Sequence, residues 1–328
     1  MNKNRVESFA RNASLEQFLN ELNSELWYTE SQILEAEIEQ RYPLIFIVGP
    51  HRSGSTLFMQ WLASLGSIAY PTNLMSRFYG SPIIGSKIQK LLSEPSLNYR
   101  DELGDFCSRT DFRSANGKTQ GLTSPNEFWY FWRRFLDFDN LVELDTEHLE
   151  SEFDSVTFKR ELYGVSNVLE KPFALKAMVM NYHIPFLAKL FDKALFIQLT
   201  REPLANIASA MEARKRQYGT YNDWYSFKFP EYELLKDMSN YEQVAGQIYY
   251  INKAVDNGLS AVCSTKKLQV SYEVFCQDPK TVYQQVHNKL AGLGCVLPKD
   301  YIGQSQFEIS RKLVTDPSIL LAYNRFWR

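Results

Sequence analysis

The 328-residue sequence predicts an α/β protein with a mostly parallel central sheet flanked by helices. Two observations predict this class. Buried-strand signals recur at 44–48, 173–176 and 194–199, and a further strand is expected at 268–272. Nearly uninterrupted apolar runs suit strands that are covered on both faces, as in parallel sheets. Segments of helical character separate these strands, and such alternation indicates βαβ units.

The N-terminal segment is expected to form an amphipathic helix. Ser14 and Gln17 make a capping-box pattern, in which each side chain satisfies a free backbone N–H at the start of a helix. Apolar residues then follow at helical spacing from Leu15 to Leu26. The pattern predicts a helix over about 14–40 that packs on the main domain.

The rest of the chain is expected to surround the strands with helices and loops. Residues 80–126 are rich in Gly, Ser, Pro, Asn and charged residues, which predicts loops and short elements of the kind that form lids and acceptor pockets. The length suits one large α/β domain, and we expect a single domain over 1–328. Further helices are expected at 55–65, 127–135, 147–169, 182–191, 203–217 and 241–257.

The composition limits the classes of partner. Hydrophobic residues make up 45% of the chain and charged residues 23%, so a sizeable core is expected. A net charge of −2 without a long run of one sign indicates neither a nucleic-acid surface nor a polybasic membrane anchor. No run of about 18 apolar residues occurs, so no membrane span is expected. The N-terminus lacks the apolar segment of a signal peptide, and we therefore expect a cytoplasmic, reduced protein.

The cysteines give no sign of a metal centre. They are widely spaced and form no CxxC pair, which is the usual spacing of a zinc site. We therefore expect no bound metal. The four positions are Cys107, Cys263, Cys276 and Cys295.

The most informative stretch is the loop that follows the first strand, Gly49-Pro50-His51-Arg52-Ser53-Gly54-Ser55-Thr56. It joins a buried strand to a predicted helix. Consecutive backbone N–H groups and the positive end of the helix converge in such a loop, which makes it a cradle for an anion. Strand, glycine loop, hydroxyl pair and helix together predict a phosphate-binding site.

The loop nearly matches the Walker A pattern GxxxxGK[ST], but its chemistry differs. Ser55 stands where the lysine that reaches the β- and γ-phosphates belongs, and the loop cation is Arg52 instead. No acidic residue ends the strand at 194–199, where an aspartate could help to hold Mg²⁺. The loop therefore suits a donor with a single 5′-phosphate that carries a sulfate, and it needs no metal.

These residues resemble the sulfotransferases that use 3′-phosphoadenosine-5′-phosphosulfate (PAPS), a family with a P-loop NTPase-like α/β fold. The loop from Arg52 to Leu57 is similar to their 5′-phosphosulfate loop. The stretch 195–203 with Ser209 resembles their 3′-phosphate motif, and Tyr272-Glu273 with Asp278-Pro279 resembles the segment whose tyrosine lies near the adenine. The resemblance runs from about 44 to 279 and is closest to the bacterial branch, which has Arg in the first loop.

The resemblance implies a role for each motif residue. Arg52 would contact the leaving-group oxygens and so act in catalysis. Lys176 would also act in catalysis, because it matches a strand lysine of the family that contacts the sulfuryl group. PAPS would be the donor and adenosine 3′,5′-bisphosphate the product. The implied donor-binding residues are Arg52, Ser53, Gly54, Ser55, Thr56, Leu57, Arg201, Ser209 and Tyr272.

The sequence departs from the family at the general base. The cytosolic phenol and steroid enzymes have a histidine two residues after the strand lysine, and Met178 stands there instead. We expect the base elsewhere, with Glu127 the first candidate, His183 the second and His51 the third. The late R-K-G motif is also missing as such, because Arg311-Lys312 lacks the glycine.

Several alternatives stay open at this point. Lys176 could pair with a carboxylate instead of a sulfuryl group, and Glu127 could merely favour a helix dipole. The aromatic run 128–132 is more typical of a core than of an acceptor pocket. The predicted activity is sulfuryl transfer to a hydroxyl or amine on a small-molecule, glycan or lipid acceptor. The alternatives are a P-loop kinase of a small hydroxylated substrate and a catalytically inactive nucleotide-binding protein. The oligomeric state is not predicted.

Overall fold

The computed structural model of the chain describes residues 5–102, 112–138, 141, 146–310 and 316–328. Its central sheet has four strands in the order β4-β1-β5-β6, and all neighbours are parallel. This confirms the predicted fold class. The strands are β1 (Leu44–Val48), β4 (Phe173–Lys176), β5 (Ala194–Thr200) and β6 (Lys267–Ser271).

The register brings the carboxyl ends of the strands to one edge of the sheet. Ile47 near the end of β1 pairs with Lys176 at the end of β4 and with Ile197 in β5. Thr200 at the end of β5 pairs with Ser271 at the end of β6. Ligands of open α/β sheets bind beyond this edge, where the loops that follow neighbouring strands meet.

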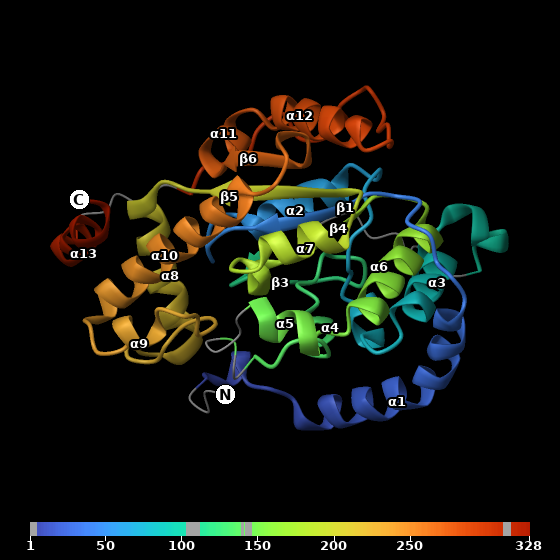
Figure 1. The fold of residues 1–328 in the computed structure, drawn as a ribbon, viewed down its shortest axis with the longest axis horizontal. Coiled ribbons are helices and arrows are strands. Elements are labelled where there is room, and N and C mark those ends of the chain that lie inside the picture. Colours follow the sequence, from blue (N-terminus) through green and yellow to red (C-terminus); the bar gives the residue numbers. More distant parts are fainter. Residues whose placement is uncertain (1–4, 103–111, 139–140, 142–145, 311–315) are drawn as a thin grey trace.

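Alternate residues of β1 pack into apolar clusters on opposite faces of the sheet. Leu44, Phe46 and Val48 belong to one cluster, and Ile45 and Ile47 belong to the other. Such a two-sided core is what the uninterrupted apolar run predicts. Figure 1 shows α6 and α7 on one side of the strands and α11 and α12 on the other.

Thirteen α-helices and a small hairpin complete the described part of the chain. The hairpin pairs β2 (Ser114–Ala115) with β3 (Lys118–Thr119) in antiparallel fashion. The helices are α1 (Ala13–Glu35), α2 (Ser55–Ser64), α3 (Pro82–Ser93), α4 (Trp129–Trp132), α5 (Thr146–Glu152), α6 (Ser155–Leu169), α7 (Ile184–Leu190), α8 (Pro203–Tyr218), α9 (Tyr232–Leu235), α10 (Asn240–Ser260), α11 (Tyr272–Gln277), α12 (Pro279–Gly292) and α13 (Pro317–Trp327).

The N-terminal helix forms as predicted, but its start and end differ. Asn12, not Ser14, is the N-cap, and its side chain accepts the Leu15 N–H at 3.0 Å. Both residue types are good caps, so the sequence did not distinguish them. The helix ends at Glu35 instead of about 40. It is fixed to α3 by Glu30, whose carboxylate accepts backbone N–H groups at the start of α3.

The region at 80–126 was expected to hold loops and short elements, and α3 corrects this prediction. Pro82 begins α3, and the Glu30 carboxylate caps it at 2.8 and 3.0 Å through the N–H groups of Ile83 and Ile84. This cap comes from a residue more than 50 positions earlier, so no local sequence pattern could predict it. Residues 103–111 lie outside the described residues.

Two predicted helices also need correction. A helix was expected at 127–135, but the structure has only the shorter α4. It begins at Trp129, because Phe128 has a left-handed backbone conformation (φ 58°) that a helix does not allow. The expected helix at 147–169 is divided into α5 and α6. Asp154 causes the division, because its side chain accepts the Thr157 N–H at 3.0 Å and starts a new helix.

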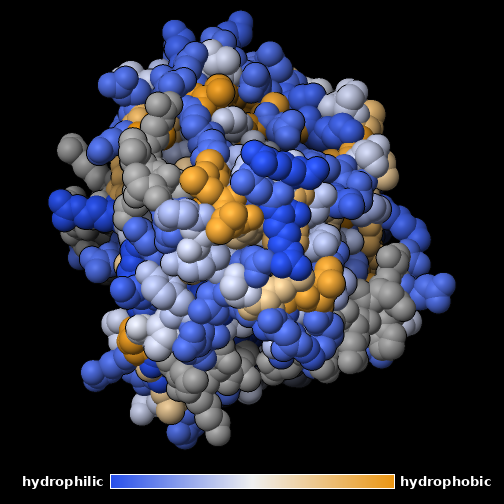
Figure 2. All heavy atoms as spheres, turned by 90° about the vertical axis from the view of Figure 1, so that its left-hand side faces the viewer, coloured by the Kyte–Doolittle hydropathy of each residue, from blue (hydrophilic) through white to orange (hydrophobic). Residues whose placement is uncertain are grey.

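The C-terminal helix α13 packs on α8 and α10 and leaves part of its apolar side exposed. Ile319 and Ala322 are buried against these helices, whereas Leu320 and Leu321 are 41% and 71% exposed. Figure 2 shows this face as mostly hydrophilic, with small apolar patches. Within the described residues, no helix combines the length and apolar character that a bilayer crossing requires.

Candidate functional site

The loop between β1 and α2 has the backbone of an anion cradle. Arg52 and Gly54 both have positive φ, at 65° and 92°, and Gly54 is the N-cap of α2. Successive N–H groups and the positive end of the helix dipole therefore face the same space. A Cβ built on Gly54 would lie 2.3 Å from Cδ2 of Tyr272, so only glycine fits between this loop and β6–α11.

Three side chains from other elements hold the backbone of this loop. Asn181 exchanges two hydrogen bonds with Gly49: its amide accepts from the Gly49 N–H at 3.0 Å and donates to the Gly49 carbonyl at 2.9 Å. The Asn206 amide on α8 donates to the His51 carbonyl at 3.0 Å. A guanidinium nitrogen of Arg201 donates to the carbonyl of the loop arginine at 3.0 Å. The cradle is thus formed before any ligand arrives.

The two arginines named by the sequence motifs lie together at this edge of the sheet. The Arg52 Nε donates to the Ser209 hydroxyl on α8 at 3.4 Å. The Arg201 guanidinium lies 4.6 Å from the ring centroid of Tyr272 and donates to the Ser310 carbonyl at 2.7 Å. Burial lowers the pKa of Arg201 below its usual value. Two guanidinium groups and a helix N-terminus favour a multiply charged anion here.

A second cluster lies on the other side of the loop, around the end of β4. Lys176 is 3% exposed, and its ammonium donates to the Thr56 hydroxyl at 2.8 Å and pairs with the Glu127 carboxylate at 2.8 Å. The Trp129 indole N–H donates to the other oxygen of Glu127 at 2.6 Å. The carboxylate partner expected as one interpretation of Lys176 is therefore confirmed, and its contact with the sulfuryl group stays a prediction.

Comparison with known proteins identifies the class of site. The family model described as the sulfotransferase family matches residues 43–293, which include the loop, Lys176, Arg201 and Tyr272. The chain belongs to the sulfotransferase family.

Relatives of this sulfotransferase include two proteins named omega-hydroxy-beta-dihydromenaquinone-9 sulfotransferase Stf3, from Mycobacterium bovis and Mycobacterium tuberculosis. Each is 24% identical over 265 residues, which make up 78% of this chain and 65% of the relative, so the match leaves about a third of each relative uncovered. The crystal structure of sulfotransferase STF9 from Mycobacterium avium matches 90% of this chain and 78% of its own, at a TM-score of 0.52 and 16% identity. This likeness shows a shared fold.

The β2–β3 hairpin covers the Lys176 cluster of this sulfotransferase. Asn116 and Gly117 form its tip, both with positive φ, as a tight hairpin turn requires. A Cβ built on Gly117 would lie 2.9 Å from Oε1 of Glu127 and 3.5 Å from Oγ1 of Thr56. The Asn116 amide donates to the Ala213 carbonyl of α8 at 3.3 Å and ties the tip across the site. The hairpin therefore covers one side of the Lys176–Glu127 pair, whose side chains are 3% and 23% exposed.

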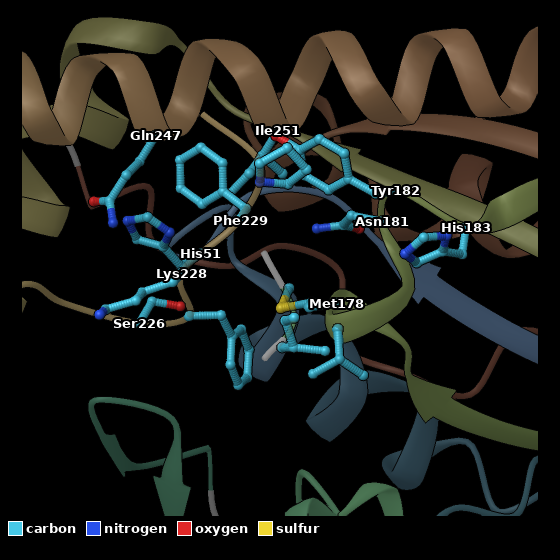
Figure 3. Close-up of a pocket in the computed structure, with 14 residues that line it drawn as sticks. His51, Met178, Asn181, Tyr182, His183, Ser226, Lys228, Phe229, Gln247 and Ile251 are labelled. Carbon is cyan, nitrogen blue, oxygen red and sulfur yellow. The ribbon is translucent and has the colours of Figure 1, made fainter. Parts of the chain in front are cut away.

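A pocket opens beside the loop, between the end of β4, the segment 226–230 and α10 (Figure 3). Its volume is about 40 Å³. Met178 lies between the pocket and the loop, with its sulfur 4.0 Å from the Ser55 hydroxyl. Aromatic and aliphatic side chains form most of the wall, among them Tyr182, Phe227, Phe229 and Ile251.

The three candidate bases have different surroundings. Glu127 contacts the Lys176 ammonium beside the cradle, as described above. His183 precedes α7 and lines the pocket. His51 also lines the pocket, with its ring edge-on to Tyr225 at 5.3 Å. Burial, and then the charge of Arg52, lower the His51 pKa to about 3, so its imidazole is neutral.

Some functional residues escaped sequence reasoning. Asn181 and Asn206 support the loop through partners more than 100 residues away, and Trp129 supports Glu127, which lies only two residues before it. The residues of the aromatic run at 128–132 have different surroundings, which the composition of the run did not predict. Phe128, Phe131 and Trp132 are core residues, whereas Trp129 contacts the candidate base.

The described residues contain no group of three or more His, Cys, Asp or Glu side chains that could hold a metal ion. Cys263, Cys276 and Cys295 are free thiols, and Cys107 lies outside the described residues. Arg311-Lys312, the remnant of the late family motif, also lies outside them. Their neighbour Ser310 is bonded through its carbonyl to Arg201 and through its N–H, at 3.2 Å, to the Tyr272 hydroxyl.

Proposed function

We propose that this protein transfers a sulfuryl group from PAPS to a hydroxyl or amine of an acceptor. The observation that supports the proposal is that Arg201 and Ser209 both contact the loop arginine, where they would supply a second set of anion contacts. A nucleotide with both 5′- and 3′-phosphates would place one phosphate on each set of contacts. A nucleoside triphosphate has a single chain of phosphates and no 3′-phosphate to contact the second set.

The residues of the site fit such a donor. The hydroxyl of Ser53 and Nε of Arg201 are buried and have no hydrogen-bond partner among the described residues. Buried polar groups are normally paired, so these atoms are ready to bind phosphate oxygens. The glycine at position 54 lets Tyr272 approach the loop, where its ring can contact an adenine.

The roles of the residues follow from their positions. The N–H groups of residues 53–56 hold the 5′-phosphate, with the hydroxyls of Ser55 and Thr56, and Leu57 anchors the first turn of α2 in the core. Arg52 contacts the leaving-group oxygens, where negative charge develops. The 3′-phosphate is held by Arg201 and Ser209.

The cluster at β4 handles the proton and the developing charge. When bound, PAPS supplies the sulfuryl group, which leaves adenosine 3′,5′-bisphosphate behind. As the acceptor oxygen forms its bond to sulfur, the bond from sulfur to the bridging oxygen breaks, and the acceptor proton goes to the Glu127 carboxylate. Lys176 holds this carboxylate and lies close enough to the cradle to stabilise charge on the sulfuryl oxygens.

The acceptor is proposed more broadly. The curated relatives are named for a hydroxylated menaquinone derivative, which is an alcohol on an apolar body. The apolar wall of the pocket supports an acceptor of similar character here. Neither the kinase alternative nor the inactive-protein alternative gains a supporting observation, because Ser55 replaces the phosphate-binding lysine and the Lys176–Glu127 pair is intact.

Calorimetry with two nucleotides tests the donor. Adenosine 3′,5′-bisphosphate should bind at least about tenfold more tightly than AMP, because each charge-assisted contact to the 3′-phosphate is worth ~1.5–3 kcal/mol. Substitution Arg201→Ala should weaken the bisphosphate much more than AMP, because AMP loses only the support that Arg201 gives to the loop backbone. Equal affinity of the wild-type protein for the two nucleotides would remove the basis for PAPS as the donor.

A further inference from the structure

Two polar residues in the mostly apolar wall of the pocket have buried atoms without a hydrogen-bond partner among the described residues. Gln247 on α10 is buried, and its amide N–H₂ donates to the Tyr225 carbonyl at 2.9 Å. A carbonyl can pair only with the amide nitrogen, so this bond fixes the orientation of the amide. The amide oxygen then points elsewhere and has no partner in the described part of the chain. Figure 3 shows Gln247 pointing from α10 toward the His51 ring.

His51 contributes two more polar atoms. Both of its ring nitrogens are buried, and neither has a hydrogen-bond partner in the ranges that the structure describes. The imidazole is neutral, since burial lowers its pKa to about 3. A neutral imidazole offers one N–H donor and one nitrogen acceptor. Gln247 and His51 both line the pocket, so its wall residues hold two unpaired acceptors and one unpaired donor among the described residues.

The chemistry of these atoms limits the occupant. The Gln247 amide oxygen can only accept, so the occupant must donate a hydrogen bond through a hydroxyl or an amine. A carboxylate would face this oxygen unfavourably. Lys228 also lines the pocket, but its ammonium lies 4.3 Å from the Tyr232 ring centroid and is engaged there. The pocket volume of about 40 Å³ admits only a compact occupant.

The pocket adjoins the reaction centre. Phe227 in its wall packs edge-on against Trp129, with ring centroids 5.1 Å apart, and Trp129 donates to the Glu127 carboxylate. On the opposite wall, Met178 contacts Ser55 in the loop. His51 is the residue that precedes Arg52. A molecule in the pocket is therefore separated from the candidate base by Phe227 and Trp129, and from the cradle by Met178.

We propose that this pocket is the acceptor subsite, and that it selects a compact apolar alcohol that carries a second hydrogen-bond donor, which Gln247 and His51 recognise. The apolar wall takes the body of the acceptor and excludes a fully hydroxylated sugar. Gln247 acts as a specificity-determining residue, because its unpaired amide oxygen determines which group can be buried beside it. This inference rests on the proposed sulfuryl transfer.

A matched pair of ring alcohols tests the selection. Cyclohexane-1,4-diol and 4-methylcyclohexanol differ only in whether the second group donates a hydrogen bond, and glucose serves as a fully hydroxylated probe. Binding is measured by ligand-observed NMR on the protein with adenosine 3′,5′-bisphosphate bound, because such small ligands bind weakly. We expect the wild-type protein to prefer the diol by roughly three- to tenfold, and to bind glucose least. Equal binding of the two ring alcohols overturns the selection by Gln247 and His51.

Two sets of variants locate the site. Gln247→Met should abolish the preference for the diol and leave the affinity for adenosine 3′,5′-bisphosphate unchanged. Gln247→Met also removes the hydrogen bond to the Tyr225 carbonyl and could therefore disturb the local structure. A second pair of variants, at Ile251, tests the pocket without changing that bond. Ile251→Phe fills the pocket and should abolish binding of both ring alcohols, whereas Ile251→Leu conserves volume and should retain it.

The outcomes separate this inference from the proposed function. If the bisphosphate binds but neither ring alcohol does, or if Ile251→Phe binds both as the wild type does, the pocket is not the acceptor subsite, although sulfuryl transfer stands. In that case ordered waters fill the pocket and satisfy its polar atoms. If the bisphosphate itself does not bind, the proposed function falls, and this inference falls with it.

Discussion

Lys176 lies at 3% exposure with its ammonium between the Thr56 hydroxyl and the Glu127 carboxylate. A buried lysine without a partner is costly, and an ion pair with further hydrogen bonds offsets that cost. The pair also joins two parts of the mechanism, because Thr56 belongs to the anion cradle and Glu127 is the candidate base. Removal of either partner therefore disturbs both stability and transfer.

The first prediction concerns Glu127. Substitution Glu127→Gln keeps the size of the side chain and removes its ability to take a proton. We expect single-turnover transfer from bound PAPS to slow by at least ~10²-fold, within the range that a positioned base contributes. The affinity for adenosine 3′,5′-bisphosphate should change little, because no phosphate contact is assigned to this residue.

Glu25→Gln on the exposed side of α1 is the matched control and should transfer at the wild-type rate. Near-wild-type transfer by Glu127→Gln would eliminate this carboxylate as the base. His183, on the pocket wall, would then be the next residue to substitute.

Individual residues also show what sequence reasoning can reach. The positions of Arg52, Arg201 and Tyr272 were predictable, because Arg52 lies in the loop after β1, Arg201 and Tyr272 directly follow β5 and β6, and strand ends meet at one edge of a parallel sheet. Gln247 was not predictable, because it lies in the middle of a long helix and its role depends on Tyr225, 22 residues earlier. Asn181 was missed for the same kind of reason, since its partner is 132 residues away.

At the level of elements, the β2–β3 hairpin is the part of the loop-rich region that reaches the site. The sequence predicted loops at 80–126 and a lid in this region, but it did not show which segment would cover the cradle. Asn116-Gly117 is a typical hairpin turn, because both residues tolerate the positive φ that the turn requires. The place of the tip over Glu127 results from packing between distant segments, which a local pattern does not contain.

The second prediction concerns the tip of this hairpin. In Gly117→Ala the new Cβ would lie 2.9 Å from Oε1 of Glu127, so either the hairpin or the carboxylate must move. We expect transfer to fall by roughly ten- to hundredfold, since a misplacement of about 1 Å can cost ~10²-fold. Steady-state transfer and calorimetry of adenosine 3′,5′-bisphosphate, measured on the same preparation, separate lost catalysis from lost donor binding.

The matched control is Gly66→Ala. Gly66 also has positive φ, at 68°, but nothing lies within 4 Å of its built Cβ. Both variants therefore carry a similar backbone strain of about 1–2 kcal/mol, and only one carries the clash. If the two variants transfer equally well, the hairpin tip does not bear on the position of Glu127.

For the molecule as a whole, the parallel sheet brings together residues that are more than 200 positions apart in the chain. The loop follows β1, Lys176 ends β4, Arg201 follows β5, and Tyr272 follows β6. Both apolar clusters are built on these same strands. The single domain over 1–328 stays a prediction. The four strands and the fold class were predictable from apolar runs, whereas the lid and the acceptor pocket depend on how loops and helices pack around them.

The distribution of charge across these elements leads to the third prediction, which concerns metal. In Walker A loops the hydroxyl that follows the lysine binds Mg²⁺. Thr56 occupies that position here, and its hydroxyl instead accepts the Lys176 ammonium at 2.8 Å. A protein cation thus lies where a kinase places its metal. With Arg52 and the N-terminus of α2, the site has the positive charge that transfer requires.

We therefore expect sulfuryl transfer from PAPS to proceed at an unchanged rate in excess EDTA, and added Mg²⁺ to have no effect on it. The control is a Mg²⁺-dependent kinase assayed in the same buffer, which must lose its activity in EDTA and regain it with Mg²⁺. A further sample with ATP and Mg²⁺ in place of PAPS should show no transfer of phosphate to the acceptor. If EDTA abolishes transfer by this protein and Mg²⁺ restores it, the Lys176 ammonium does not replace the metal, and the kinase alternative regains its support.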